Sequence, residues 1–343
     1  MSYVAKGRNV IHNGNFNVWQ RGTSFAAAIS AQYLADRWRY VFSNDSIVTI
    51  ALDTGVPTVA SQYSLKVSCT TADETIGAAQ YSLLRHAFEL SDWTDMLYGK
   101  PWVLSFWVKA YQTGTFCVAF REMYGGTASY VAEYTINNSA TWEKKTIQIP
   151  SPTIGTWNAG GVANAGVMSF EFMLSMGSNF QTTPNVWVAS DKYCTANQTN
   201  FTSSTDNYIQ FSQVQLEAGT AATEFDAIPY ADELARCQRY LVMYGGTANE
   251  GKAVGLAYNT TIGLFPLPLP VEMRAIPAVG YSAVSDWQVY ITSAPTDAAT
   301  ITVNGSSPNN GCVSVTSGTY TGFQALYFNA KNTAARLYLS SEI

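Results

Sequence analysis

WVLSFWVKA (Trp102–Ala110) alternates on a period of two. Successive side chains of a β-strand point to opposite faces, so this stretch predicts a strand with one apolar face and one mixed face. The same alternation recurs at residues 116–121 and 168–174. Together the three stretches predict half-buried antiparallel strands around a shared core.

Shorter segments extend this pattern along the first two thirds of the chain. Further strands are predicted at residues 46–53, 63–69, 82–90, 130–136, 144–149, 185–188 and 208–216. Turn-forming pairs separate them, at 13–14, 125–126, 137–138 and 160–161. Many short strands with regular turns predict an all-β fold, a jelly-roll β-sandwich. Trp19, Trp38 and Trp142 are expected to fill its core.

One segment departs from the β pattern. Residues 226–240 are rich in helix formers, with Pro229 at the expected start, acidic residues first and arginines last. This predicts one short linking helix. Beyond it, strands are predicted at 278–283, 287–292, 300–303, 311–317, 323–330 and 335–339. The predicted organisation is an N-terminal segment (1–10), a jelly roll (11–225), the helix (226–240) and a smaller C-terminal β-sandwich domain (241–343).

Composition narrows the function classes. Of the 343 residues only 13% are charged, about half the usual ~25%, and the net charge is −5. An acidic chain without a basic cluster predicts no nucleic-acid partner. No apolar run approaches the ~20 residues of a membrane span, and the first residues lack the apolar core of a secretory leader. The five cysteines are widely spaced, which predicts buried thiols rather than a disulfide framework.

Catalytic motifs are missing from the sequence. The chain has two histidines, His12 and His86, and neither lies in a nucleophile, zinc or phosphate-binding motif. Glycoside hydrolysis needs only two carboxylates. Four glutamates are candidates, but the sequence cannot pair them: Glu122, Glu133, Glu143 and Glu171. We therefore predict a protein that is not an enzyme.

Several segments, taken in order, resemble a known family. VIHNGNFNVWQRG (10–22) is similar to the opening strand of carbohydrate-binding-module-like jelly rolls, and LYGKPWVLSFWVKA (97–110) to their central strand. VQLEAGTAATEFDAIPYADELARCQRYL (214–241) resembles the junction of bacteriophage tail-fibre and related virion proteins, where the last strand runs into a helix. FPLPLPVEMRAIPAVGYS (265–282) resembles the C-terminal domain that follows in those proteins.

The resemblance implies a bacteriophage virion fibre or receptor-binding protein that adheres to host-surface glycans. It also implies a homotrimer, attachment to other virion proteins through residues 1–10, and synthesis in the host bacterial cytoplasm before incorporation into the particle. Two alternatives stay open. One is a structural virion component, such as a tail-tip, collar or head-decoration protein, without sugar binding. The other is a capsule depolymerase.

Candidate ligand contacts follow from the alternation. If Phe106, Phe120 and Phe172 face the core, the residues between them face away from it. An outward Trp with charged neighbours suits a sugar, whose apolar face stacks on the indole. The candidate glycan contacts on this face are Trp107, Lys109, Arg121 and Glu171. Trp287 and Tyr290 are added from a group of aromatic residues in the C-terminal domain, because the tips of fibres usually carry receptor contacts. Coverage of this face by loops or by a neighbouring subunit is the alternative.

Jelly rolls of this kind often hold a structural calcium ion, and calcium takes six to eight oxygen ligands, several of them carboxylates. Near the first and last strands this chain offers neutral groups instead: Asn15, Asn17, Ser212 and Gln213. Asp36 and backbone carbonyls are the remaining candidate ligands. We therefore predict no cofactor.

Overall fold

The computed structural model describes residues 8–123, 128–157, 161–291, 294–321 and 323–343. These residues form two compact units, the first reaching to Glu233 and the second running from Leu234 to Glu342, with Ile343 grouped with the first. Of the predicted attachment segment, residues 1–7 lie outside the described residues, as does the predicted turn at 125–126.

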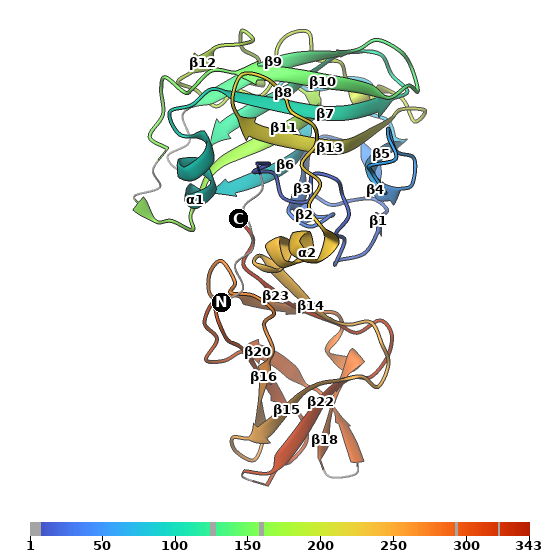
Figure 1. The fold of residues 1–343 in the computed structure, drawn as a ribbon. Coiled ribbons are helices and arrows are strands. Elements are labelled where there is room, and N and C mark those ends of the chain that lie inside the picture. Colours follow the sequence, from blue (N-terminus) through green and yellow to red (C-terminus); the bar gives the residue numbers. More distant parts are fainter. Residues whose placement is uncertain (1–7, 124–127, 158–160, 292–293, 322) are drawn as a thin grey trace. The chain divides into compact units, whose positions relative to one another are not determined.

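The first unit is a sandwich of two antiparallel sheets (Figure 1). Sheet A has the strand order β1 (Ser24–Phe25), β4 (Ile47–Asp53), β5 (Ser64–Thr71), β13 (Tyr208–Ala218), β7 (Trp102–Ala110), β10 (Glu143–Ile149). Sheet B has the order β12 (Trp187–Val188), β9 (Ser129–Ile136), β8 (Gly114–Glu122), β11 (Gly166–Met176), β6 (Tyr81–Glu89), β3 (Trp38–Ser43), β2 (Gln32–Tyr33). The predicted jelly-roll β-sandwich is confirmed.

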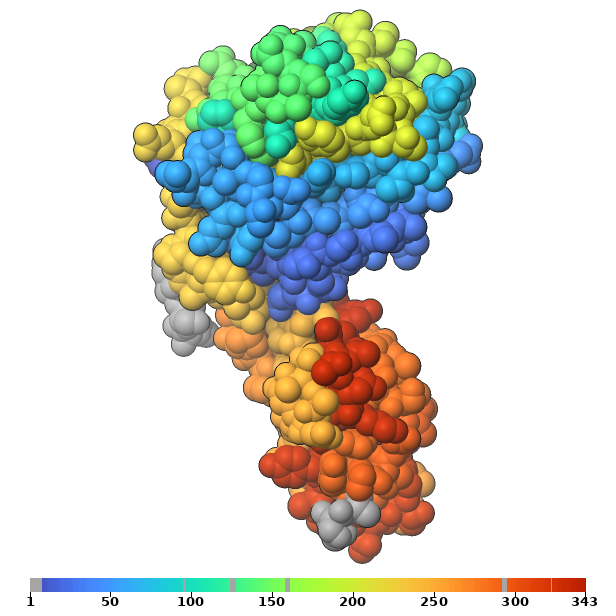
Figure 2. Space-filling model, turned by 90° about the vertical axis from the view of Figure 1, so that its right-hand side faces the viewer, coloured from blue at the N-terminus to red at the C-terminus, as the bar shows by residue number. Residues whose placement is uncertain are grey.

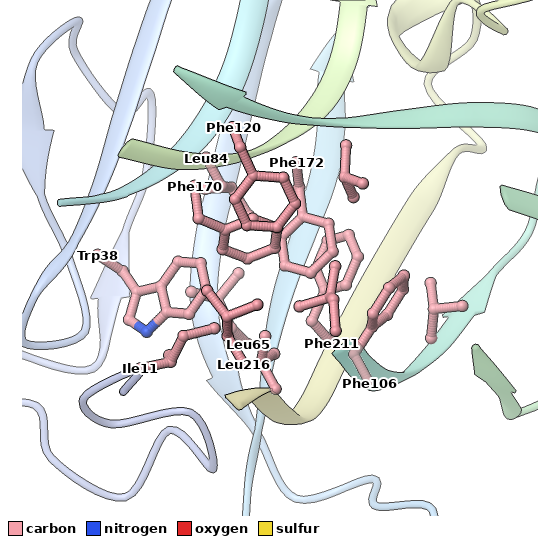
Figure 3. Packing of buried hydrophobic residues seen from close by; sticks show 14 of the residues in the cluster. Ile11, Trp38, Leu65, Leu84, Phe106, Phe120, Phe170, Phe172, Phe211 and Leu216 are labelled. Atoms are coloured by element: carbon pink, nitrogen blue, oxygen red, sulfur yellow. The ribbon is translucent and has the colours of Figure 1, made fainter. Parts of the chain in front are cut away.

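Aromatic side chains join the two sheets. Phe172 on β11 and Phe211 on β13 stack with ring centroids 4.1 Å apart, and Phe106 lies 5.0 Å from Phe172. Figure 3 shows these rings converging with Trp38, which is fully buried as expected. Burial of this much apolar surface is the main favourable term in folding. The period-two pattern therefore identified the core side of β7, β8 and β11 correctly.

The expected opening strand at residues 10–22 is wrong. This segment folds into turns, although it runs beside β13, where Val10 N–H donates to Leu216 O (3.0 Å) and Val214 N–H to Gly14 O (2.8 Å). The left-handed residue of its first turn is Asn13, with φ +54°. Gly14 is required for a different reason, because a Cβ there would collide with the carbonyl oxygen of Val214.

Connections between strands are bound to the sandwich. The amide of Asn200, just before the short 3-10 turn η4 (Phe201–Ser203), donates to Asp73 O (2.9 Å). In Figure 2 the yellow surface of this segment lies against the blue surface that follows β5. The segment that contains the 3-10 turn η3 (Ser178–Phe180) covers part of the outer face of sheet B, where Cys117, Met173 and Cys194 form a second apolar cluster.

Two short helical segments follow β6, α1 (Leu90–Asp92) and the π-helical turn η1 (Trp93–Leu97). A longer helix, α2 (Tyr230–Gln238), forms where the single helix was predicted. The boundary between the two units falls inside it, after Glu233. None of the helices in the described part of the chain has the length and apolar character needed to cross a bilayer.

The second unit is a smaller all-β sandwich. Its first sheet has the order β14 (Leu241–Gly245), β23 (Arg336–Ser340), β17 (Ala278–Tyr281). Its second sheet, sheet E, has the order β19 (Ala294–Asp297), β18 (Trp287–Ile291), β22 (Ala325–Ala330), β15 (Gly251–Ala257), β16 (Ile262–Leu267), β21 (Gly311–Thr316), β20 (Thr300–Val303). A 3-10 turn, η5 (Val284–Asp286), precedes β18. The core contains Trp287, Phe328 and Leu339.

All five cysteines are free thiols, and four of them are buried. Burial raises the pKa of Cys117 to about 11 and that of Cys194 to about 12, which keeps both thiols protonated at neutral pH. The prediction of buried thiols without a disulfide framework is confirmed for all but Cys312, which is half-buried.

Candidate functional site

The four predicted contacts of the first unit lie on two different faces. Trp107 and Lys109 belong to β7 in sheet A, whereas Arg121 and Glu171 belong to β8 and β11 in sheet B. Both sheets direct their phenylalanines into one shared core, so the residues between them point outward on opposite sides of the sandwich. The expectation that Lys, Arg and Glu together flank Trp107 is therefore wrong.

Glu171 is fully buried and is already paired. Its Oε1 accepts hydrogen bonds from Arg85 Nε (2.7 Å), Arg121 Nη1 (3.0 Å) and Ser169 Oγ (3.0 Å). Burial opposes ionisation of the carboxyl, and the two guanidinium groups outweigh it, so the pKa of Glu171 lies below its ordinary value. Arg121 also pairs with Asp191. This network holds the covering segment to sheet B and leaves no surface there for a ligand at Glu171.

The two predicted contacts of the second unit, Trp287 and Tyr290, differ in how deeply they are buried. Trp287 is fully buried and stacks on Phe328 with ring centroids 5.0 Å apart, so it is a core residue and the expectation of a glycan contact is wrong. The strand itself forms where it was predicted, as β18. Tyr290 is half-buried on the outer face of sheet E, opposite Tyr327 of β22.

The outer face of sheet A brings aromatic and cationic side chains together. Strand register places Lys66, Gln210 and Lys109 side by side across β5, β13 and β7. The next row contains Ser212 and Trp107 and ends at Lys144 of β10. Trp142, which directly precedes β10, lies beside Lys109. We call the set of Trp107, Trp142, Tyr208, Lys66, Lys109 and Lys144 the aromatic–lysine face.

Two ammonium groups lie over rings on this face. Lys109 Nζ is 5.4 Å from the ring centroid of Trp142 and 6.0 Å from that of Tyr208, and Lys66 Nζ is 4.9 Å from Tyr208. Cation–π attraction holds each lysine low against the sheet without neutralising it. Asp53 lies 3.7 Å from Lys66 Nζ, whereas the structure gives Lys109 no carboxylate partner among the described residues.

The loop between β4 and β5 forms the rim of the aromatic–lysine face. Ser64 Oγ donates to Gly55 O (2.7 Å), and Gln210 Nε2 donates to Ser64 Oγ (3.3 Å). Gly55 N–H in turn donates to Asp53 Oδ1 (2.7 Å). The rim is thus fixed to the sheet by hydrogen bonds, which keeps a binding surface preorganised.

Three members of this face were not predicted from the sequence: Lys66, Tyr208 and Lys144. A fourth, Trp142, was predicted at the wrong place. Trp142 was expected in the core, yet it is half-buried on the outer face. Its position follows from the register, because Lys144 pairs with Trp107 and Trp142 has the same parity as Lys144. Lys66 and Tyr208 carry no signal of their own. They reach the site because β5 and β13 are neighbours in the sheet, a pairing that the sequence does not specify.

The first unit also has a hollow of about 220 Å³ beside the start of α2. Its lining includes the polar side chains of Asn15, Asn17 and Gln62 and the aromatic side chains of Phe225 and Tyr230. The carboxylate of Glu233 is also in its wall, and Glu233 Oε1 accepts a hydrogen bond from Asn13 N–H (2.8 Å).

Several of the residues considered for calcium or for catalysis make hydrogen bonds within the protein. Asp36 accepts from Gln20 N–H (2.7 Å) and from Gln20 Nε2 (2.8 Å), and Ser212 and Gln213 bind Ser61. Glu122 Oε1 accepts from Thr156 N–H (2.9 Å), and Glu143 accepts from Asn138 N–H (2.8 Å). Within the described residues, no three His, Cys, Asp or Glu side chains are grouped to hold a metal ion.

No family model and no curated protein matches the sequence. Among solved structures, the enzymatically active domain of bacteriophage CBA120 tailspike protein 4 matches 62% of this chain at 16% identity (TM-score 0.34), and the match covers only 22% of the tailspike chain. A family 11 carbohydrate-binding module from Clostridium thermocellum, solved with a mixed-linked tetrasaccharide, matches 58% of this chain and 98% of its own at 14% identity (TM-score 0.31). TmCBM61, solved with β-1,4-galactotriose, matches 62% of this chain and 99% of its own at 10% identity (TM-score 0.31).

Proposed function

We propose that the first unit binds an acidic glycan through the aromatic–lysine face of sheet A. The observation that carries the proposal is the position of Lys109, whose ammonium lies between the rings of Trp142 and Tyr208 without a carboxylate partner among the described residues. Indole and phenol rings stack on the apolar face of a sugar ring. The unpaired ammonium is placed to meet an acidic substituent on that sugar.

Charge favours an acidic ligand over a neutral one. Lys66, Lys109 and Lys144 line the face, and Asp53 is the one carboxylate among the described residues that pairs with any of them. The chain as a whole has a net charge of −5, so this face is positive in an otherwise acidic protein. Such a local field attracts anions and raises their rate of encounter. Uronic acids and other carboxylate-bearing sugars have the required chemistry.

The proposed context is a bacteriophage virion, with the chain as a fibre or receptor-binding protein on the host surface. Support comes from the resemblance of residues 214–241 and 265–282 to phage virion proteins. Single sugar contacts are weak, and several copies on one particle would supply avidity. Detection of the chain in purified particles by mass spectrometry tests this context, and its absence from particles that infect normally would contradict it.

The experiment that tests glycan binding compares the wild type with Trp107→Ala on immobilised bacterial polysaccharides, both acidic and neutral. Removal of a stacking indole is expected to weaken binding to acidic polysaccharides about tenfold or more. Trp187→Ala is the control, because Trp187 is also half-buried but belongs to β12 in sheet B. Absence of binding by the folded wild-type protein would favour the structural-component alternative.

A further inference from the structure

We infer that the hollow beside α2 is a second ligand site, separate from the aromatic–lysine face, and that it takes one neutral, hydroxyl-rich ring such as a hexopyranose unit. Its walls come from residues 13–17, the loop at 60–62 and residues 225–233, all within the first unit. None of these residues belongs to the aromatic–lysine face.

The key polar atom is Asn17 Oδ1. It is buried and has no hydrogen-bond partner among the described residues. A buried acceptor without a donor is unfavourable, because it has given up its hydrogen bonds to water and gained none in the protein. Asn17 also lines the hollow. A hydroxyl donor on a bound ligand would satisfy it.

The other residues of the hollow offer hydrogen-bonding groups for the hydroxyls of a sugar and an apolar wall for its ring. Gln62 lines the hollow, is exposed and makes no hydrogen bond to a described residue, so its amide can donate and accept. Within the described part of the chain, the Asn15 side chain makes two long hydrogen bonds, to Ala60 O (3.5 Å) and from Ser212 Oγ (3.4 Å). Phe225 and Tyr230 provide an apolar wall on which the ring's C–H face can lie.

The charge and the size of the hollow disfavour three other kinds of ligand: anions, calcium ions and oligosaccharides. None of the described residues that line the hollow is Lys or Arg, and Glu233 makes it unfavourable for an anion. A single carboxylate is too few for calcium, which takes several. The volume of about 220 Å³ lies below the ~300 Å³ at which pockets for drug-sized ligands begin, so one ring fits better than an oligosaccharide.

The backbone of the hollow is fixed in advance. Asn13 Nδ2 donates to Val18 O (2.8 Å) and Asp36 O (3.1 Å), and Asn13 Oδ1 accepts from Val18 N–H (3.0 Å). This closes the turn that carries Asn15 and Asn17. The N–H of Asn13 also holds Glu233 in place. A preformed site loses little conformational entropy on binding.

Saturation-transfer NMR with methyl glycosides of glucose, galactose, mannose and N-acetylglucosamine tests the inference on the full chain. At least one glycoside is expected to receive transfer from the wild type, with an affinity about tenfold lower in Asn17→Ala. Gln62→Ala, an exposed substitution that leaves the core intact, is expected to weaken the same binding. Asn309→Ala, an exposed asparagine of the second unit, is the matched control.

The Trp107→Ala variant separates the two sites. Transfer to the neutral glycoside should persist in Trp107→Ala, whatever that variant does to acidic polysaccharides. Transfer that disappears in Trp107→Ala and survives in both Asn17→Ala and Gln62→Ala would place the sugar on sheet A and overturn the inference. Transfer to none of the four glycosides by the folded wild type would also overturn it.

Discussion

At the scale of single residues, the lysines of sheet A and sheet B contrast sharply. Lys109 lies over two rings and has no carboxylate partner among the described residues, whereas Lys192 on the sheet B side donates to Asn179 O (2.8 Å). Both side chains are half-buried and both carry one positive charge. The pair therefore allows the local role of Lys109 to be separated from the general effect of net charge.

Lys109→Gln should weaken binding to an acidic polysaccharide about tenfold, since it removes the ammonium that meets the ligand's carboxylate. The remaining binding should also depend less on salt between 50 and 300 mM NaCl, because salt screens charge pairs. Both effects are measurable by biolayer interferometry. Lys192→Gln should change neither value, and an equal loss in both variants would contradict a specific role for Lys109.

Glu171 is expected to make the stability of the fold depend on pH. Its folded-state pKa lies below the ordinary value of 4.5, so the native protein binds fewer protons than the unfolded chain. The ion pairs with Arg85 and Arg121 therefore stabilise the fold fully above pH 4.5, and this stabilisation is lost as pH falls through the lowered pKa. Glu171→Gln should cost about 3 kcal/mol at pH 7.

Urea unfolding at pH 7, 5 and 3 tests this prediction. The difference in unfolding free energy between wild type and Glu171→Gln should be largest at pH 7 and shrink toward pH 3. Ser169→Ala serves as a reference, because it removes one hydrogen bond to the same carboxylate and leaves both ion pairs. A difference independent of pH would indicate that packing, and not charge, determines the effect.

Residue roles were only partly predictable from the sequence. Alternation correctly placed Trp107 and Lys109 on an outward face, since the period of two fixes the face of each strand. Alternation could not place Trp287, which was chosen as one of a group of aromatic residues and is buried. It also could not tell that β7 and β8 belong to different sheets, and therefore it grouped Arg121 with Trp107.

At the scale of elements, β13 organises much of the first unit. It lies between β5 and β7, and residues 9–14 run along its far half through hydrogen bonds at Val10 and Val214. The register of β13 with β7 shifts between Ser212 and Gln215, and Gln213 has φ +50° there. This bulge directs Gln213 Nε2 to Thr58 Oγ1 and Ser61 Oγ (both 2.8 Å). One strand thus positions both the rim loop and the hollow.

Gly14→Ala tests that arrangement. The added Cβ would collide with the carbonyl oxygen of Val214, and backbone atoms cannot move aside easily. Overpacking of this kind typically costs about 1–3 kcal/mol, which in a unit of this size lowers Tm by several degrees. Gly99→Ala is a control with open space around the Cβ, although its positive φ (+70°) adds some strain. A Tm unchanged in Gly14→Ala would contradict the close approach.

Most strands were predicted within a few residues because their alternation is strong. The segment at 10–22 failed for a physical reason. Its apolar residues Val10, Ile11, Phe16 and Val18 are buried, but turns bring them inward, and no regular strand forms. The π-helical turn η1 was also missed, since five residues at a strand end carry too little periodicity to be recognised.

At the scale of the whole molecule, the two units expose different surfaces. The first presents lysines over aromatic rings. The outer face of sheet E in the second is apolar, with Val254 58%, Leu256 54% and Tyr327 54% exposed. Val254 lies directly opposite Tyr327 in the register. Strands β15, β16, β18, β20, β21 and β22 contain a single charged residue, Lys252. Large exposed apolar patches commonly mark protein interfaces.

We propose that this face joins copies of the chain in the homotrimer that the resemblance implies. A second copy can approach without like-charge repulsion, because the face carries almost no charge. Leu256→Asp would place three carboxylates in the buried contact, and unpaired buried charges are strongly unfavourable. The variant is therefore expected to elute as a monomer in size-exclusion chromatography with light scattering, where the wild type elutes as a trimer.

Val59→Asp puts the same charge on a fully exposed apolar position of the first unit and should leave the trimer intact. A wild type that is monomeric, or a trimer that survives Leu256→Asp, would remove sheet E from the assembly.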